Sequence, residues 1–164
     1  MSVSTIEELF LDELRDLYSA EKQITKSLPK MAKASTSTEL KAAFESHLKE
    51  TEGQIDRLNR VFEILGKSSR GKVCAGMKGV LEEGAETLTE AEKGPVRDAA
   101  LISAGQRVEH YEMAGYGSAR EYARLLGQDE IASLLEETLS EEKEADKKLN
   151  TIAKQVNASA LKAA

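Results

Sequence analysis

Residues 131–156 read IASLLEETLSEEKEADKKLNTIAKQV, a stretch that combines a helical apolar pattern with acidic residues inside that pattern. Its leucines and isoleucines recur every three or four residues, which predicts a long amphipathic helix over residues 129–156. Glu142 falls near the centre of the apolar stripe, and Asp146 follows one turn later on the same face. The stretch therefore predicts an all-α fold with acidic side chains facing its own interior.

Three other segments have the same apolar period. They predict long helices over residues 4–34, 38–65 and 96–126. Between the last two, glycines interrupt the chain, and only a short amphipathic helix near residues 77–88 is expected. We also expect Pro29 to bend or end the first helix, and residues 157–164 to fray.

The lengths of the joins predict the topology. Short joins make the first and last pairs of long helices antiparallel hairpins, whereas the long join between the second and third can carry the chain back along the molecule. The prediction is a single domain over residues 1–164, a ferritin-like four-helix bundle whose long crossover carries a short fifth helix between helices two and three.

Composition limits the classes of function. Charged residues make up 32% of the 164 residues and hydrophobic ones 40%, as in soluble globular domains. The net charge of −6, with no long basic stripe, argues against nucleic acid as the main partner. No apolar run is long enough to span a membrane. One cysteine, Cys74, and no visible signal peptide favour a cytoplasmic location.

Polar residues also interrupt the apolar stripes of the other long helices. The residues within these stripes or at their edges are Glu13, Glu21, His47, Glu50, Gln54, Glu109 and Glu112. One glutamate in each long helix lies near the middle of that helix, so an antiparallel bundle would bring four carboxylates into one layer of the core. The four are Glu21, Glu50, Glu112 and Glu142.

Such a layer favours a bound cation, because carboxylates removed from water are strongly destabilised and repel one another. Carboxylates with few nitrogen ligands suit iron or manganese. Known dinuclear bundles pair Glu-x-x-His motifs, but this chain has two histidines and Gly53 stands three residues after Glu50. A site here would be unusually rich in carboxylates. Each in-stripe glutamate can instead reach solvent from the flank of its helix, His47 can be a hydrogen-bonded core residue, and the tyrosines are predicted to pack.

Four segments together resemble the YciF-like family. They are ELRDLYSAEKQ (13–23), HLKETEGQIDRL (47–58), VEHYE (108–112) followed by Tyr116-Gly117, and LSEEK (139–143) leading to Asp146. This family is a rubrerythrin-related branch of the ferritin-like superfamily. The resemblance implies a four-helix bundle, a homodimer, a dinuclear iron or manganese centre and a role in bacterial stress.

Carried onto this chain, the resemblance implies a set of metal ligands. They are Glu21, Glu50, Glu109, Glu112 and Glu142, with His47, Gln54 and Asp146 as further ligands or as supports for them. Two functions from different classes remain open. One is metal-dependent peroxide or iron handling, and the other is a structural or interaction role in stress, with a vestigial metal site.

Overall fold

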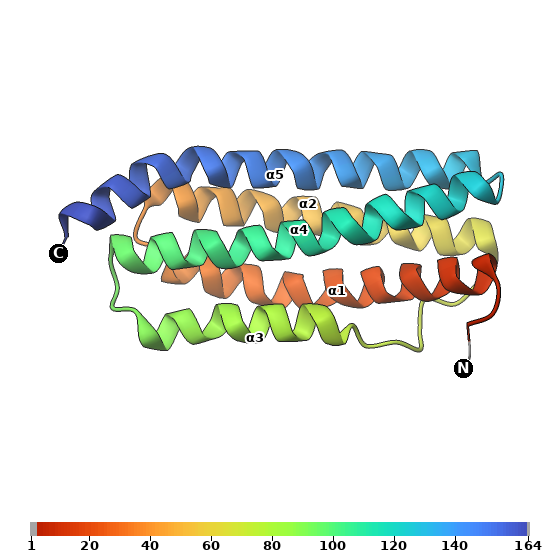
Figure 1. Ribbon diagram of the computed structural model, residues 1–164, viewed down its shortest axis with the longest axis horizontal. Helices are drawn as coiled ribbons and strands as arrows, with labels where there is room; N and C mark the ends of the chain where they lie inside the picture. The colour runs from red at the N-terminus through yellow and green to blue at the C-terminus, as the bar shows by residue number, and fades with distance from the viewer. Residues whose placement is uncertain (1–2, 164) are drawn as a thin grey trace.

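A computed structural model describes residues 3–163, and these residues contain five helices and no strand (Figure 1). The helices are α1 (Ile6–Ala34), α2 (Thr38–Leu65), α3 (Ala75–Glu90), α4 (Pro95–Leu125) and α5 (Asp129–Lys162). The predicted all-helical class is confirmed.

The four long helices lie side by side, and α3 lies against their outside (Figure 1). Each long helix contacts two others, since α1 packs on α2 and α4 while α5 packs on α2 and α4. The short α3 covers α1 and α4. It carries the chain back along the molecule, so that α2 and α4 run in the same direction (Figure 1).

The helix ends follow local sequence signals. Thr5 caps α1 by accepting a hydrogen bond from the Glu8 amide at 3.2 Å, and Glu8 accepts one from the Thr5 amide at 3.3 Å. These reciprocal bonds satisfy two amides that the helix itself leaves unpaired. Gly66 ends α2 in the left-handed region, with φ of 61°, where glycine has no steric penalty.

Two helices continue where an end was expected. Pro29 does not end α1, because buried Leu28 and Ala32 hold the helix against the core on both sides of it. Of the tail expected to fray, residues 157–162 instead continue α5 to Lys162, and residue 164 lies outside the described residues. No glycine or proline interrupts α5, and its last turns consist largely of good helix formers.

The apolar core is divided into two clusters. One contains Ile24, Leu28, Phe44, Leu101 and Leu149 among others, and the second contains Phe10, Leu14, Leu58, Leu135 and Leu139 among others. In α2, α4 and α5 the predicted polar residues lie between the segment that packs in one cluster and the segment that packs in the other, and in α1 Glu21 lies beside Ala20, where the first cluster begins. A polar layer therefore crosses the core near its middle.

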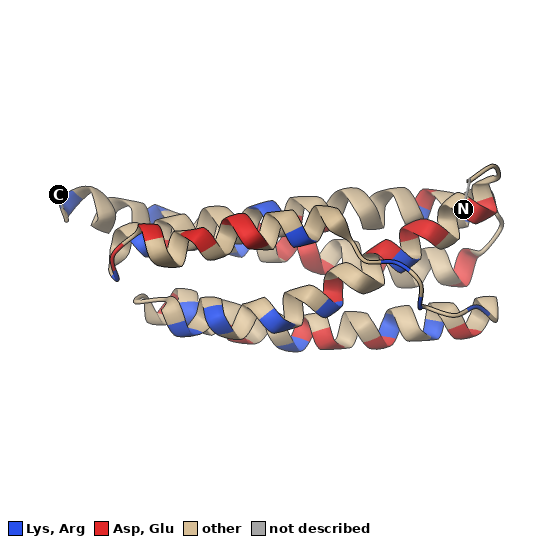
Figure 2. Ribbon diagram, turned by 90° about the horizontal axis from the view of Figure 1, so that it is seen from below, with Lys and Arg blue, Asp and Glu red and all other residues tan. Residues whose placement is uncertain are grey.

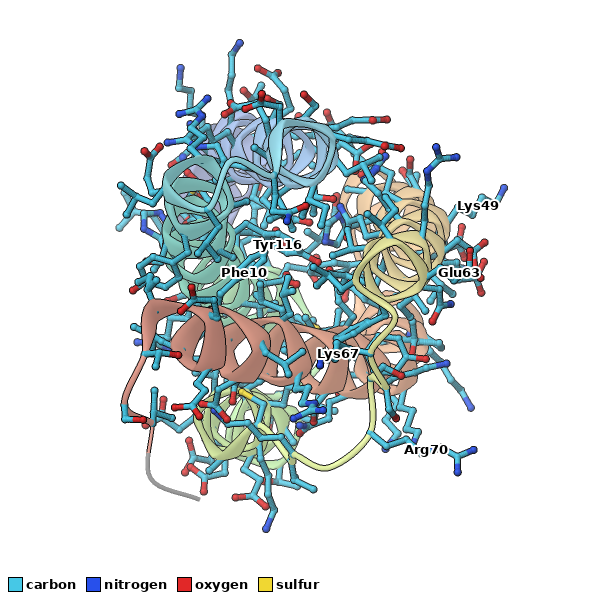
Figure 3. All side chains as sticks on the ribbon, turned by 90° about the vertical axis from the view of Figure 1, so that its right-hand side faces the viewer. Phe10, Lys49, Glu63, Lys67, Arg70 and Tyr116 are labelled. Atoms are coloured by element: carbon cyan, nitrogen blue, oxygen red, sulfur yellow. The ribbon has the colours of Figure 1, made fainter. Side chains whose placement is uncertain are left out.

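Seen along the helices, Phe10 and Tyr116 point into the interior, whereas Lys49 and Glu63 point outward (Figure 3). Charged residues of both signs lie along the length of the molecule (Figure 2). Within the described residues, no helix combines the length and apolarity needed to cross a membrane.

Candidate metal centre

Four buried side chains from three helices converge within the polar layer. They are His47 from α2, Glu109 and Glu112 from α4, and Glu142 from α5. One nitrogen or oxygen atom from each lies within 4.8 Å of the corresponding atoms of the others. The spacing of Glu109 and Glu112 by three residues places both on one face of α4.

His47 is oriented by the carboxylate of Glu50, which is not one of the four converging residues. His47 Nδ1 lies 3.2 Å from Glu50 Oε2, and Nδ1 is the donor because the pKa of Glu50 is lowered and its ionised carboxylate can only accept. The opposite ring nitrogen, Nε2, lies 3.4 Å from Glu109 Oε1 and 3.6 Å from Glu142 Oε2. With the proton on Nδ1, the Nε2 lone pair is directed into the cluster, which is the tautomer that a metal ligand requires.

Glu21 brings the fourth long helix to the same region. It is fully buried, and its Oε1 accepts a hydrogen bond from the Tyr116 hydroxyl of α4. Burial, followed by the charge on Glu142, raises the pKa of Glu21 well above its usual range. The Tyr116 hydroxyl is itself buried, and burial raises its pKa well above the ordinary value, so it acts as a hydrogen-bond donor.

The carboxyl groups of the cluster have strongly perturbed acidity. Burial, followed by the charges on Glu21 and Glu142, raises the pKa of Glu112 well above its usual range. Burial and the neighbouring Glu142 have the same effect on the pKa of Glu109. Burial also raises the pKa of Glu142, against the opposing effects of the neighbouring Glu109 carboxyl group and of nearby His47. The group as a whole therefore binds protons unless another cation replaces them.

Several buried atoms in this layer have no hydrogen-bond partner. They are Glu21 Oε2, His47 Nε2, Gln54 Oε1, Glu109 Oε2, and both carboxylate oxygens of Glu112 and of Glu142. More than nine in ten buried polar groups in folded proteins have a partner, and each unsatisfied one costs about 1–3 kcal/mol. Such a concentration of unpaired oxygens around one imidazole nitrogen fits a cation site.

Gln54 and its neighbours enclose the layer on the side of α5. Gln54 Nε2 donates to Glu141 Oε2 at 3.0 Å. Arg57 holds the same carboxylate with two hydrogen bonds, of 2.9 and 3.0 Å, and donates to Thr138 at 2.6 Å. These contacts leave the amide oxygen of Gln54 free within the core.

Two of the predicted site residues lie outside the buried group. The Glu50 side chain is 44% exposed and contacts the outer nitrogen of His47. The Asp146 side chain is 18% exposed, accepts a hydrogen bond from Gln106 at 3.1 Å, and lies 3.4 Å from His110 Nε2. The remaining six predicted residues are buried in the layer.

Sequence reasoning missed two elements of this region. Tyr116, expected only to pack, holds Glu21 in place, and its position one turn after Glu112 was the available signal. The network of Arg57 with Glu141 and Thr138 gave no such signal, because Arg57 is more than 80 residues from both partners in the chain.

These features define a class of all-helical proteins whose core is crossed by a buried histidine and carboxylate layer. The chain belongs to the YciF-like family, since residues 5–162 match the sequence model described as a domain of unknown function (DUF892). It is 48% identical to protein YciF of Escherichia coli K12 over 155 residues, which is 93% of each chain.

Solved structures agree with this assignment. The crystal structure of the Escherichia coli stress protein YciF matches with a TM-score of 0.92 and 45% identity, covering 95% of this chain and 99% of that one. YcfI, a candidate structural protein from Rhodopseudomonas palustris, matches with a TM-score of 0.88 and 45% identity, covering 92% and 96%. A Xanthomonas campestris protein at 23% identity shares the fold, with a TM-score of 0.76 and coverage of 96% and 97%.

Proposed function

We propose that the chain is a single ferritin-like domain that binds two iron or manganese ions in the polar layer of its core. The four long helices would form the bundle, with α3 as the short fifth helix of its crossover. The observation that carries the proposal is the set of unpartnered carboxylate oxygens around His47 Nε2. A divalent cation pair would satisfy these atoms and balance their charge.

The donor set fits these metals. Glu109, Glu112, Glu142 and the Nε2 atom of His47 would be ligands, because they converge and are unpaired. Glu21 would be a further ligand through the oxygen that Tyr116 leaves free. One imidazole among several carboxylates is a hard donor set, as iron and manganese prefer.

The remaining predicted residues would support these ligands. Glu50 would fix the tautomer of His47 through Nδ1, and Gln54 would hold Glu141, the chain neighbour of Glu142. Asp146 would support the layer only indirectly, through the hydrogen bond that it accepts from Gln106. No single residue is assigned a catalytic role.

Bound iron or manganese would supply one-electron redox chemistry, which suits the reduction of peroxide or the oxidation and storage of Fe(II). The protein's own part would be to exclude bulk water, because Glu21, Glu112 and Glu142 are fully buried. Carboxyl groups with raised pKa would also accept or release protons beside the reacting centre.

The biological setting follows from the relatives. The Escherichia coli protein is a stress protein, and we extend that role to this chain. We further propose a homodimer in the cytoplasm, with neither nucleic acid nor membrane as its partner. Size-exclusion chromatography with light scattering tests the dimer.

A metal titration with matched variants tests the site. Metal-free protein is titrated anaerobically with Fe(II) and with Mn(II), beside Glu142→Ala and Glu144→Ala. Glu144 is exposed on the same helix and lies 3.5 Å from Lys147, so its loss should leave binding unchanged. Glu142→Ala should abolish or strongly weaken binding. Equal binding by all three proteins would show that the site is assigned wrongly.

A structural or interaction protein of the stress response, with a vestigial metal site, is the second candidate. The description of the Rhodopseudomonas palustris relative supports it, as does the lack of Glu-x-x-His pairs. In that case shared protons, such as one between Glu109 and Glu142, would satisfy the layer. Chelators would then leave stability unchanged, and Fe(II) would not bind.

A further inference from the structure

A groove of about 830 Å³ runs between α2 and α5 on the outside of the layer. Its charged lining consists of Glu39, Glu50, Glu137, Glu141, Glu144, Lys147 and Lys148. Five carboxylates and two lysines make the groove acidic, so it raises the local concentration of cations.

A smaller recess continues from this groove toward the core. It measures about 20 Å³, room for roughly one water molecule. Groove and recess share Glu50, Ala145 and Lys148, whereas His47 and Glu109 belong to the inner recess alone. The shared residues therefore form the boundary between solvent and the buried cluster.

The recess ends on atoms that lack partners. His47 is 6% exposed and Glu109 3% exposed, and both line the recess. His47 Nε2 and Glu109 Oε2 make no hydrogen bond. The hollow beneath α3 and the grooves at the two ends of the long helices include neither residue.

Most carboxylates of the groove are already paired, but Glu50 lies at the boundary. Arg57 binds Glu137 and Glu141, and Lys147 lies near Glu144. Glu50 touches His47 with one oxygen, and its side chain is 44% exposed. Its carboxylate therefore reaches the groove on one side and the first buried ligand on the other.

We propose that the groove between α2 and α5 is the route by which a divalent cation reaches the buried cluster, with Glu50 as the transfer ligand. This inference rests on the proposed metal site. A hydrated cation exchanges water for Glu50 at the narrow recess and passes to His47 and Glu109. Lys148 lines the same boundary and opposes the passage of cations.

The test is the rate of metal uptake. Metal-free protein is mixed with Co(II) in a stopped-flow instrument and followed by the visible absorption of bound Co(II), while equilibrium dialysis gives stoichiometry and affinity. Glu50→Gln retains an oxygen that accepts from His47 Nδ1, so the imidazole keeps its orientation. Glu45→Gln is the matched control, since Glu45 is an exposed residue of α2 paired with Lys41 at 3.9 Å and lies outside the groove.

We expect Glu50→Gln to slow uptake at least about five-fold at low ionic strength and Lys148→Gln to accelerate it, with both effects reduced by salt. The stoichiometry should be the same in every variant, and Glu45→Gln should behave as the parent in rate and affinity. Parent-like uptake by Glu50→Gln would overturn the route while leaving the metal site intact. Loss of stoichiometry in Glu50→Gln would make Glu50 a permanent ligand and overturn the transfer role. Failure of the parent to bind any metal would instead refute the proposed function.

Discussion

Replacing Glu112 by glutamine should stabilise the metal-free protein at pH 8. Glu112 is fully buried, and neither of its oxygens has a partner. Burial and the charges on Glu21 and Glu142 raise its pKa well above the usual range, so its ionised form destabilises the fold. Glutamine has nearly the same shape and no charge. Its amide N–H can donate to the unpaired carboxylate oxygens of the layer, and a hydrogen bond to a charged group is worth about 1.5–3 kcal/mol, which corresponds to a Tm increase of about 3–12 °C for a chain of this size.

The assay is thermal unfolding followed by circular dichroism, in chelator and again with excess Mn(II). Glu112→Gln should have the higher Tm in chelator, whereas Mn(II) should raise the Tm of the parent more than that of the variant, because the variant lacks a ligand. Glu121→Gln is the control on the same helix, since Glu121 is exposed and paired with Arg120 and Arg124. A lower Tm for metal-free Glu112→Gln would refute the view that this carboxylate destabilises the empty core.

Three further predictions concern stability. The buried glutamates of the layer have a raised pKa in the folded state, so they stabilise it below their unfolded pKa and lose this effect as pH rises. The Tm of the metal-free protein should therefore increase as the pH falls from 8 to about 4.5. Below about pH 4.5 this trend should reverse, because a hydrogen bond from His47 lowers the pKa of Glu50 in the folded state. A pH series of melts in chelator measures this, and a flat profile would contradict it. Asp98→Ala should lower the free energy of unfolding in urea by about 2–4 kcal/mol. The Asp98 carboxylate is 2% exposed and accepts hydrogen bonds of 2.8 and 2.7 Å from two backbone amides in the turn between α1 and α2. A loss below about 1 kcal/mol would contradict this prediction. Gly115→Ala should cost about 1–3 kcal/mol, because the alanine Cβ would lie 2.7 Å from a leucine of α1. In Gly117→Ala the added Cβ meets nothing within 4 Å, so this change should stabilise the helix by up to about 1 kcal/mol. Equal effects of the two changes in urea unfolding would refute the close approach at Gly115.

Much of the helical layout could be predicted from the sequence, because apolar period and capping are local signals. α2 spans Thr38–Leu65, which is the range predicted for this helix. The same periodicity placed Glu112 and Glu142 on apolar faces, and both are fully buried. The longer α5 shows the limit of this reasoning, since a polar tail can remain helical when nothing interrupts it.

The distribution of residues within the layer was less predictable. The midpoint argument placed Glu50 in the layer, but Glu50 lies at the edge of its apolar stripe, and the inward-facing His47 one turn earlier takes the inner position. Asp146 shares a face with Glu142, yet four residues advance a helix by slightly more than one turn, and the side chain points toward Gln106. Contacts such as Arg57 with Glu141 depend on the axial register of two helices, which local sequence does not specify.

Metal content tests the central claim most directly. The protein is purified without chelator or affinity metal, and elemental analysis is made before and after anaerobic loading with Fe(II) and Mn(II). The account predicts about two iron or manganese ions per chain, as in dinuclear carboxylate bundles, and their loss in Glu112→Ala. A protein that contains no metal and takes up none on loading would contradict the account and leave an acidic, proton-sharing core.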